Sequence, residues 1–134
     1  MNYLEWNIYI EEEPDLYDPI GYIKITGDEG IIIEDYTYLD NFFAALVEGV
    51  ERIQIEDVVR ADPIVEPNDI IFSRKDNLLE IEYGTQKVII FNQHQFTEEV
   101  KIAVTELIKI LDEFADSSKQ QQLEIFKLRR FSGK

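Results

Sequence analysis

The residues best suited to chemistry in this chain are one histidine and a large set of carboxylates. Because His94 is the only histidine, metal sites that need two imidazoles are excluded, and acid–base catalysis near neutral pH would fall on this residue. It lies in the polar stretch Asn92–Gln95, where we interpret it as a solvated loop residue. No serine stands in a G-x-S-x-G turn, the usual nucleophile elbow.

Carboxylates crowd into one short stretch near the N-terminus. They are Glu11, Glu12, Glu13, Asp15 and Asp18. Such oxygens suit calcium or magnesium, but their spacing departs from an EF-hand loop, and Pro14 and Pro19 stiffen the stretch. We interpret it as a solvated acidic loop and keep a carboxylate- or metal-dependent enzyme as an alternative function.

Cofactor sites with a recognisable sequence are missing. The chain has no cysteine, which excludes thiolate ligands, and no GxxxxGK[ST] or GxGxxG phosphate loop. We therefore assign no catalytic residue, no metal ligand and no cofactor.

The net charge of −15 belongs entirely to the first half of the chain. Residues 1–72 carry 18 carboxylates and three basic residues, whereas residues 73–134 carry ten of each. A field of this sign repels nucleic acid and anionic membranes, and it accelerates encounter with a basic protein. Solubility is the plainer explanation of an acidic surface.

Aromatic residues are concentrated in the same acidic region. Six of the seven tyrosines and the only tryptophan, Trp6, precede residue 39. Tyrosine and tryptophan are enriched among interface anchors, and acidic rims steer basic partners. Tyrosine also favours strands, so a purely structural role is the alternative. We predict partner binding at Tyr9, Asp15, Tyr17, Asp18, Tyr36 and Tyr38.

These features favour a non-catalytic protein that captures a basic protein partner. Electrostatic attraction would bring the two together, and burial of a few aromatic anchors would hold them. By size and charge, small toxin-neutralising proteins of the immunity or antitoxin type are the analogy.

Alternating apolar and polar residues predict strands in two runs. The first run comprises Tyr3–Ile10, Ile20–Thr26 and Ile31–Ile33. The second comprises Ile70–Ser73, Leu78–Tyr83 and Lys87–Phe91, joined by short turns typical of antiparallel hairpins. We expect Ile31–Ile33 and Val88–Phe91 to be buried on both faces. Between the runs, Pro63 and Pro67 restrict residues 54–67 to edge strands or a bulged connection.

Apolar residues at helical spacing predict helices over Tyr38–Ile53 and Thr97–Ala115. Thr37 or Asp35 is expected to cap the first helix and Thr97 the second. A third, less amphipathic helix is predicted over Lys119–Arg130, within the C-terminal segment 117–134. It suggests another function, a self-associating assembly subunit or homodimer through Leu123, Phe126 and Phe131.

Runs of strands followed by helices indicate an α+β fold, with two amphipathic helices packed on an antiparallel sheet. A chain of 134 residues suits a single domain. The similar phrases ITGDEGIII and EYGTQKVII each precede a helix and suggest a duplicated βββα unit. No apolar run approaches the ~20 residues of a membrane span, and no signal-peptide pattern opens the chain, so we expect a cytoplasmic protein.

Overall fold

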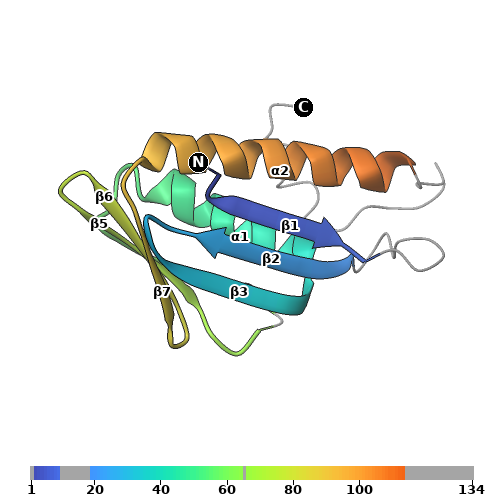
Figure 1. The fold of residues 1–134 in the computed structure, drawn as a ribbon, viewed down its shortest axis with the longest axis horizontal. Helices are drawn as coiled ribbons and strands as arrows, with labels where there is room; N and C mark the ends of the chain where they lie inside the picture. The colour runs from blue at the N-terminus through green and yellow to red at the C-terminus, as the bar shows by residue number, and fades with distance from the viewer. Residues whose placement is uncertain (1, 10–18, 65, 114–134) are drawn as a thin grey trace.

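One antiparallel sheet of seven strands organises the part of the chain that the computed structural model describes, residues 2–9, 19–64 and 66–113 (Figure 1). The strands are β1 (Leu4–Ile8), β2 (Ile20–Thr26), β3 (Glu29–Tyr38), β4 (Val58–Ala61), β5 (Ile70–Lys75), β6 (Leu78–Tyr83) and β7 (Gln86–Ile90). The helices are α1 (Leu39–Arg52) and α2 (Gln93–Glu113). Strand order in the sheet is β1-β2-β3-β7-β6-β5-β4. The predicted α+β class with an antiparallel sheet is confirmed.

The meander from β5 to β7 follows the turn chemistry of the sequence. Lys75 pairs with Leu78 and Tyr83 pairs with Gln86, so each hairpin has a two-residue loop. The first loop residues, Asp76 and Gly84, have φ values of 55° and 60°. Such loops require positive φ, which aspartate tolerates and glycine adopts freely. The β4 strand lies at a sheet edge, as expected from Pro63 and Pro67, which follow it in the chain.

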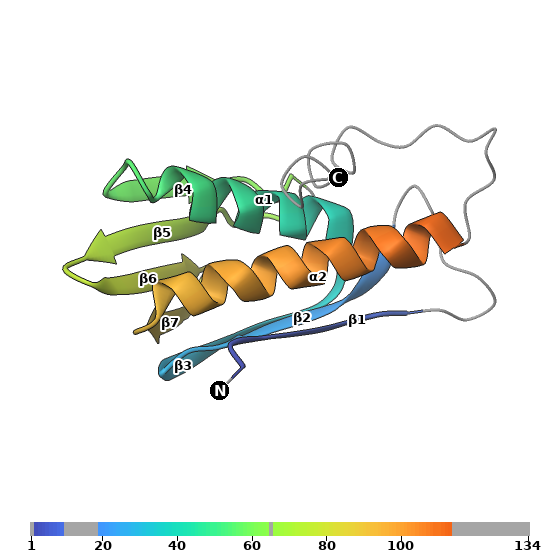
Figure 2. The same cartoon turned by 90° about the horizontal axis from the view of Figure 1, so that it is seen from above.

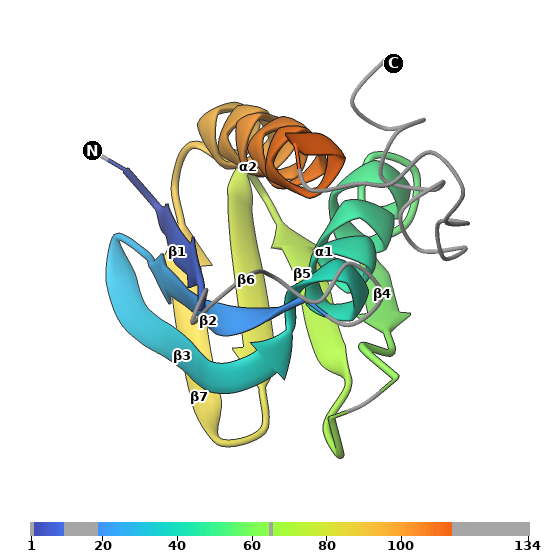
Figure 3. The same cartoon turned by 90° about the vertical axis from the view of Figure 1, so that its right-hand side faces the viewer.

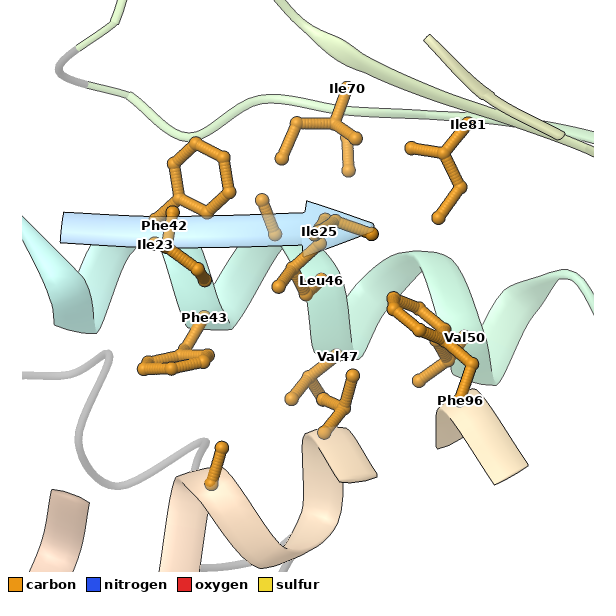
Figure 4. Close-up of a cluster of buried hydrophobic side chains, with 14 of the residues drawn as sticks. Ile23, Ile25, Phe42, Phe43, Leu46, Val47, Val50, Ile70, Ile81 and Phe96 are labelled. Carbon is orange, nitrogen blue, oxygen red and sulfur yellow. The ribbon is translucent and has the colours of Figure 1, made fainter. Parts of the chain in front are cut away.

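Both helices lie on the concave side of the twisted sheet (Figures 2 and 3). Phe42 and Leu46 of α1 point toward strand residues such as Ile23 and Ile70, whereas Val47 points toward α2 (Figure 4). All five side chains are buried. Burial of each contributes about 1.5–3 kcal/mol, which fixes α1 between the sheet and α2.

Tyr3 ties the start of the chain to distant elements. The backbone N–H groups of Tyr3 and Leu4 donate to Glu99 Oε1 of α2 at 2.8 and 3.0 Å. The Tyr3 hydroxyl donates to Asp28 in the β2–β3 turn at 2.8 Å, and its ring meets Phe96 edge-on at 6.4 Å. The edge strand β1 is thereby held against α2 and the turn.

The helix α1 begins without the side-chain cap that the sequence predicts. Tyr38 occupies the N-cap position and makes no side-chain cap bond. Thr37 is buried and donates its hydroxyl to Glu66 at 2.9 Å, while the Asp35 carboxylate binds the N–H of Tyr36. Both predicted caps are therefore wrong, because tertiary partners compete for their oxygens.

The helix α2 begins one turn earlier than predicted, at Gln93. Asn92 Oδ1 accepts the N–H of Gln95 at 3.0 Å, which is the bonding pattern of an N-cap. Thr97, the predicted cap, lies inside the helix and donates its hydroxyl to the Gln93 carbonyl at 3.0 Å. The extra turn begins within Asn92–Gln95, the polar stretch that the sequence predicts to be a loop.

The face of the sheet opposite the helices is not covered by any described element. Ile31 and Ile33 are 47% and 46% exposed, and Phe91 is 54% exposed. The expectation that their two runs are buried on both faces is therefore wrong. Since strand side chains alternate between faces, only Ile32 and its like-facing neighbours reach the helical side.

Three expectations have no test in the described residues. The predicted helix Lys119–Arg130 and the whole segment 117–134 lie outside them. The duplicated βββα unit stays a prediction.

Within the described ranges, neither helix has the length and apolar character that crossing a membrane requires.

Gly49 of α1 lies against the ring of Phe72, and its substitution tests this packing. A Cβ at Gly49 would lie 2.1 Å from Phe72 Cε1, so ring or helix must move. Glycine inside a helix normally costs about 1 kcal/mol relative to alanine. We nevertheless expect Gly49→Ala to lower the unfolding free energy by about 2 kcal/mol, measured by urea denaturation.

The double variant Gly49→Ala/Phe72→Leu is the matched control for this packing. It should be less destabilised than the sum of its two single changes, because the smaller side chain makes room for the new methyl group. A Gly49→Ala protein as stable as the wild type would contradict the described contact.

Candidate functional site

The outward face of β1, β2 and β3 combines aromatic and aliphatic side chains with carboxylates. Strand register places Glu5 beside Lys24 and Lys24 beside Ile33, so these residues share one face. The ladder continues past β1, where the N–H of Tyr9 donates to the Ile20 carbonyl at 2.8 Å. We call this surface the tyrosine face and define it by Tyr9, Tyr22, Ile31, Ile33 and Tyr36.

Tyrosine rings from three strands meet on this face. The centroids of Tyr9 and Tyr36 lie 5.0 Å apart with a 48° interplanar angle, and those of Tyr9 and Tyr22 lie 6.4 Å apart at 35°. Both distances fall in the range of favourable aromatic pairs. Tyr36 nevertheless stays 75% exposed. The Tyr36 ring therefore contacts Tyr9 while most of its surface faces solvent.

Tyr36 stands at a β-bulge in a strained backbone conformation. The β2–β3 register shifts between Gly21 and Ile23, so that Asp35 and Tyr36 both stand opposite Tyr22. Its φ of 54° lies in the left-handed region, which costs an ordinary residue about 1–2 kcal/mol. Strain of this kind clusters at functional sites, where bulges re-aim side chains.

The Asp35 carboxylate joins the bulge to the end of β1. Its Oδ1 accepts the hydroxyl of Tyr9 and, at 2.9 Å, the N–H of Tyr36. The bond from Tyr9 to this charged acceptor raises the pKa of Tyr9 to about 12. Partial burial, aided by Glu5, raises the pKa of Tyr22 as well. Both phenols are therefore neutral at physiological pH.

Three of the six predicted partner-binding residues lie in the described part of the chain. The structure brings Tyr9 and Tyr36 into ring contact. Tyr38 lies opposite Ile20 and precedes α1, and no ring contact among the described residues includes it. The others, Asp15, Tyr17 and Asp18, lie outside the described residues, as do the self-association residues Leu123, Phe126 and Phe131.

Sequence reasoning missed three of the five residues that define the tyrosine face. Tyr22, Ile31 and Ile33 belong to it through register, and Glu5 lies on its rim. A signal was present for Tyr22, because alternation puts it in phase with the charged Lys24 instead of the buried Ile23. Ile31 and Ile33 gave no such signal, because in a run of three isoleucines the residue type does not distinguish outward-facing from inward-facing positions.

The outward face of the other half-sheet is different in kind. Glu80 of β6 binds Lys87 at 2.6 Å and Lys75 at 3.3 Å, and it is only 9% exposed. The two ammonium groups, Lys87 above all, lower the pKa of Glu80. Charges on β5–β7 are thus balanced by neighbours, whereas the tyrosine face presents aromatic rings with an acidic rim.

A pair of carboxylates links β3 to the loop between β4 and β5. Tyr83 donates its hydroxyl to Glu34 at 2.5 Å, and Thr37 donates to Glu66 at 2.9 Å. Burial and the neighbouring carboxylate of Glu34 raise the pKa of Glu66. Raised carboxyl pKa values occur at acid–base sites. Here both carboxylates bind hydroxyls of the protein itself, which favours a structural link.

A groove of about 430 Å³ lies where the end of α1 meets the start of α2. His94 lines it and is exposed, in the first turn of α2. Arg74, also in the lining, donates to the Gln54 carbonyl and to Asp57, both at 3.2 Å. Across the described ranges, no three histidine or carboxylate residues are grouped in a way that could hold a metal ion.

Comparisons with protein-family models, with curated proteins and with solved structures found no match to this chain. Because a fold alone does not define a function, the chemistry of the tyrosine face has to carry the functional conclusion.

Asp35→Asn tests the bond that organises the face. We expect the pKa of Tyr9 to fall from about 12 toward the value of about 10 found in free tyrosine, because the amide is an uncharged and weaker acceptor. NMR titration of ring-labelled tyrosine measures it. Glu29→Gln on the same strand is the control and should leave Tyr9 unaffected. An unchanged titration in Asp35→Asn would contradict the described bond.

Glu66→Gln tests the carboxylate pair through stability. A carboxyl with a raised folded-state pKa contributes stability below its unfolded-state pKa, and this contribution is lost as pH rises through the folded-state pKa. Glutamine keeps an acceptor for Thr37 and adds a donor for Glu34. We therefore expect Glu66→Gln to raise Tm at neutral pH by roughly 3 °C, measured by calorimetry.

The difference between Glu66→Gln and wild type should vanish below the ordinary glutamate pKa of about 4.3, where Glu66 is protonated in both states. Glu98→Gln, at an exposed position of α2, is the matched control and should change Tm little at either pH. A lower Tm for Glu66→Gln at neutral pH would contradict the raised pKa.

Proposed function

We propose that this protein is a non-catalytic binding protein that captures a basic protein partner on the tyrosine face. Tyr36 carries the proposal. A large aromatic side chain is kept at positive φ and projects into solvent, although glycine or asparagine would satisfy the bulge at lower cost. Strained residues of this kind cluster at binding sites, so a role in binding accounts for an exposed aromatic ring at this position.

The composition of the face supports a protein interface. Tyrosine rings gather at its bulge end, and the exposed Ile31 and Ile33 extend the apolar area along β3. Interface centres are enriched in aromatic residues and depleted in charge, whereas their rims are polar. Here Glu5 and Asp35 provide the rim.

The charge of the region supports a basic partner. Among the described residues before α1, Lys24 is the one basic side chain, and it stands against five carboxylates: Glu5, Asp28, Glu29, Glu34 and Asp35. An acidic field of this kind speeds encounter with a positively charged surface and repels nucleic acid. Encounter is proposed to take place in the cytoplasm, the location expected from the sequence.

Capture would then proceed in two stages. Long-range attraction raises the association rate, and burial of Tyr36, Ile31 and Ile33 slows dissociation. Each fully buried side chain of this size contributes about 1.5–3 kcal/mol, part of which offsets the lost freedom of the two proteins. Small toxin-neutralising proteins of the immunity or antitoxin type are the class that works in this manner.

Affinity capture with variants tests the proposal. Immobilised wild type, Tyr36→Gly and the double variant Glu5→Gln/Asp35→Asn are incubated with native lysate, and retained proteins are identified by mass spectrometry. We expect the wild type to retain a basic protein, more strongly at low than at moderate salt. Tyr36→Gly should lose it at both salt concentrations. The double variant should associate more slowly and with a flatter salt dependence.

Stability separates loss of binding from loss of structure. Glycine accepts positive φ without strain, so Tyr36→Gly should have a Tm no lower than that of the wild type. Ile102→Ala, at an exposed position of α2, is the control and should retain the same partner as the wild type. Retention of the basic protein by Tyr36→Gly would contradict the proposed function.

A further inference from the structure

The exposed ring of Tyr36 lies directly beside a carboxylate. The N–H of Tyr36 and the hydroxyl of Tyr9 both bind Oδ1 of Asp35, so ring and carboxylate belong to adjacent residues of one bulge. Contact with Tyr9 limits the movement of the Tyr36 ring. A group that approaches the free surface of this ring therefore meets a fixed π-face and a negative charge together.

A cation fits this combination. The face of an aromatic ring is electron-rich and attracts a positive group within about 6 Å of its centroid. Asp35 adds a full negative charge at the same bulge, bonded to the Tyr36 N–H and to the hydroxyl of the neighbouring Tyr9, and Glu5 adds another on the same side of the sheet. Lys24, the one basic residue of β1–β3 among the described residues, lies directly opposite Glu5 and Ile33, whereas the bulge lies opposite Tyr22.

The planar guanidinium of arginine suits the site better than the ammonium of lysine. It stacks flat on an aromatic ring and is more weakly hydrated, so it loses less when it leaves water. Its donors lie in the plane of the stack, where they reach a carboxylate at the ring edge. An ammonium group can also lie over a ring, but it is compact and strongly hydrated, so it gains less from the contact.

We propose that the tyrosine face recognises an arginine side chain of its partner. The guanidinium stacks on the exposed ring of Tyr36 and donates hydrogen bonds to the carboxylate of Asp35. This inference rests on the proposed function, because it names the side chain by which the basic partner is held.

Two synthetic peptides distinguish arginine recognition from general attraction. They have the same length and charge, and their basic residues are all arginine in one and all lysine in the other. Binding to the full chain is followed at low salt by the fluorescence anisotropy of an attached dye. We expect the arginine peptide to bind a few-fold more tightly, because the guanidinium stacks flat on the ring and loses less hydration than the ammonium.

Variants of Tyr36 and Asp35 test whether these residues cause the preference for the arginine peptide. Tyr36→Phe keeps the ring and should keep the preference, whereas Tyr36→Gly should bind both peptides equally. Asp35→Asn should weaken the binding of both. Phe91→Ala, an exposed aromatic position on the β7 side of the sheet, is the matched control and should bind like the wild type.

The outcomes separate this inference from the proposed function. Equal binding of the two peptides by the wild type would overturn arginine recognition and leave capture by charge intact. A preference that survives in Tyr36→Gly would also overturn it, since the ring would not be its source. Failure to bind either peptide overturns the inference too, whereas the proposed function is judged by retention of the basic protein from lysate.

Discussion

The two halves of the sheet meet at a short junction on which the rest of the structure depends. Within the described residues, β3 and β7 pair at two positions, Glu29 with Ile89 and Gly30 with Val88. Beyond them, the side-chain amide of Gln86 accepts the N–H of Ile33 at 2.8 Å and donates to its carbonyl at 3.2 Å. A side chain thus satisfies backbone groups where the strands part. This divergence lets the sheet curve around both helices (Figure 3).

The same divergence gives β3 room for its bulge. After Ile33, contacts on that side of the strand come from side chains, such as the bond from the Tyr83 hydroxyl to Glu34. A bulge disrupts the ladder of any strand that it interrupts, so a strand fully paired on both sides resists an extra residue. Because Tyr36 lies beyond the junction, only its pairing with β2 has to shift. The curved core and the exposed tyrosine are therefore consequences of one constraint.

Local patterns predicted the elements but not their arrangement. The hairpins from β5 to β7 and the bodies of α1 and α2 follow from periodicity and turn residues, which act over a few positions. The neighbours β3 and β7 are far apart in sequence, and no local signal pairs them. The sequence predicts Tyr9 and Tyr36 as binding residues because tyrosine is enriched at interfaces. The bulge, and the position of Tyr22 opposite it, follow only from the strand register, which depends on tertiary packing.

The attachment of Tyr3 to α2 has a consequence for the order of events during synthesis. The chain is made from its N-terminus, yet the N–H of Tyr3 binds Glu99, 96 positions later. A contact of this separation closes a long loop and forms late. The edge strand β1, which leads directly to Tyr9, is therefore secured only after α2 has left the ribosome. A nascent chain that still lacks α2 therefore also lacks the finished β1 edge of the tyrosine face.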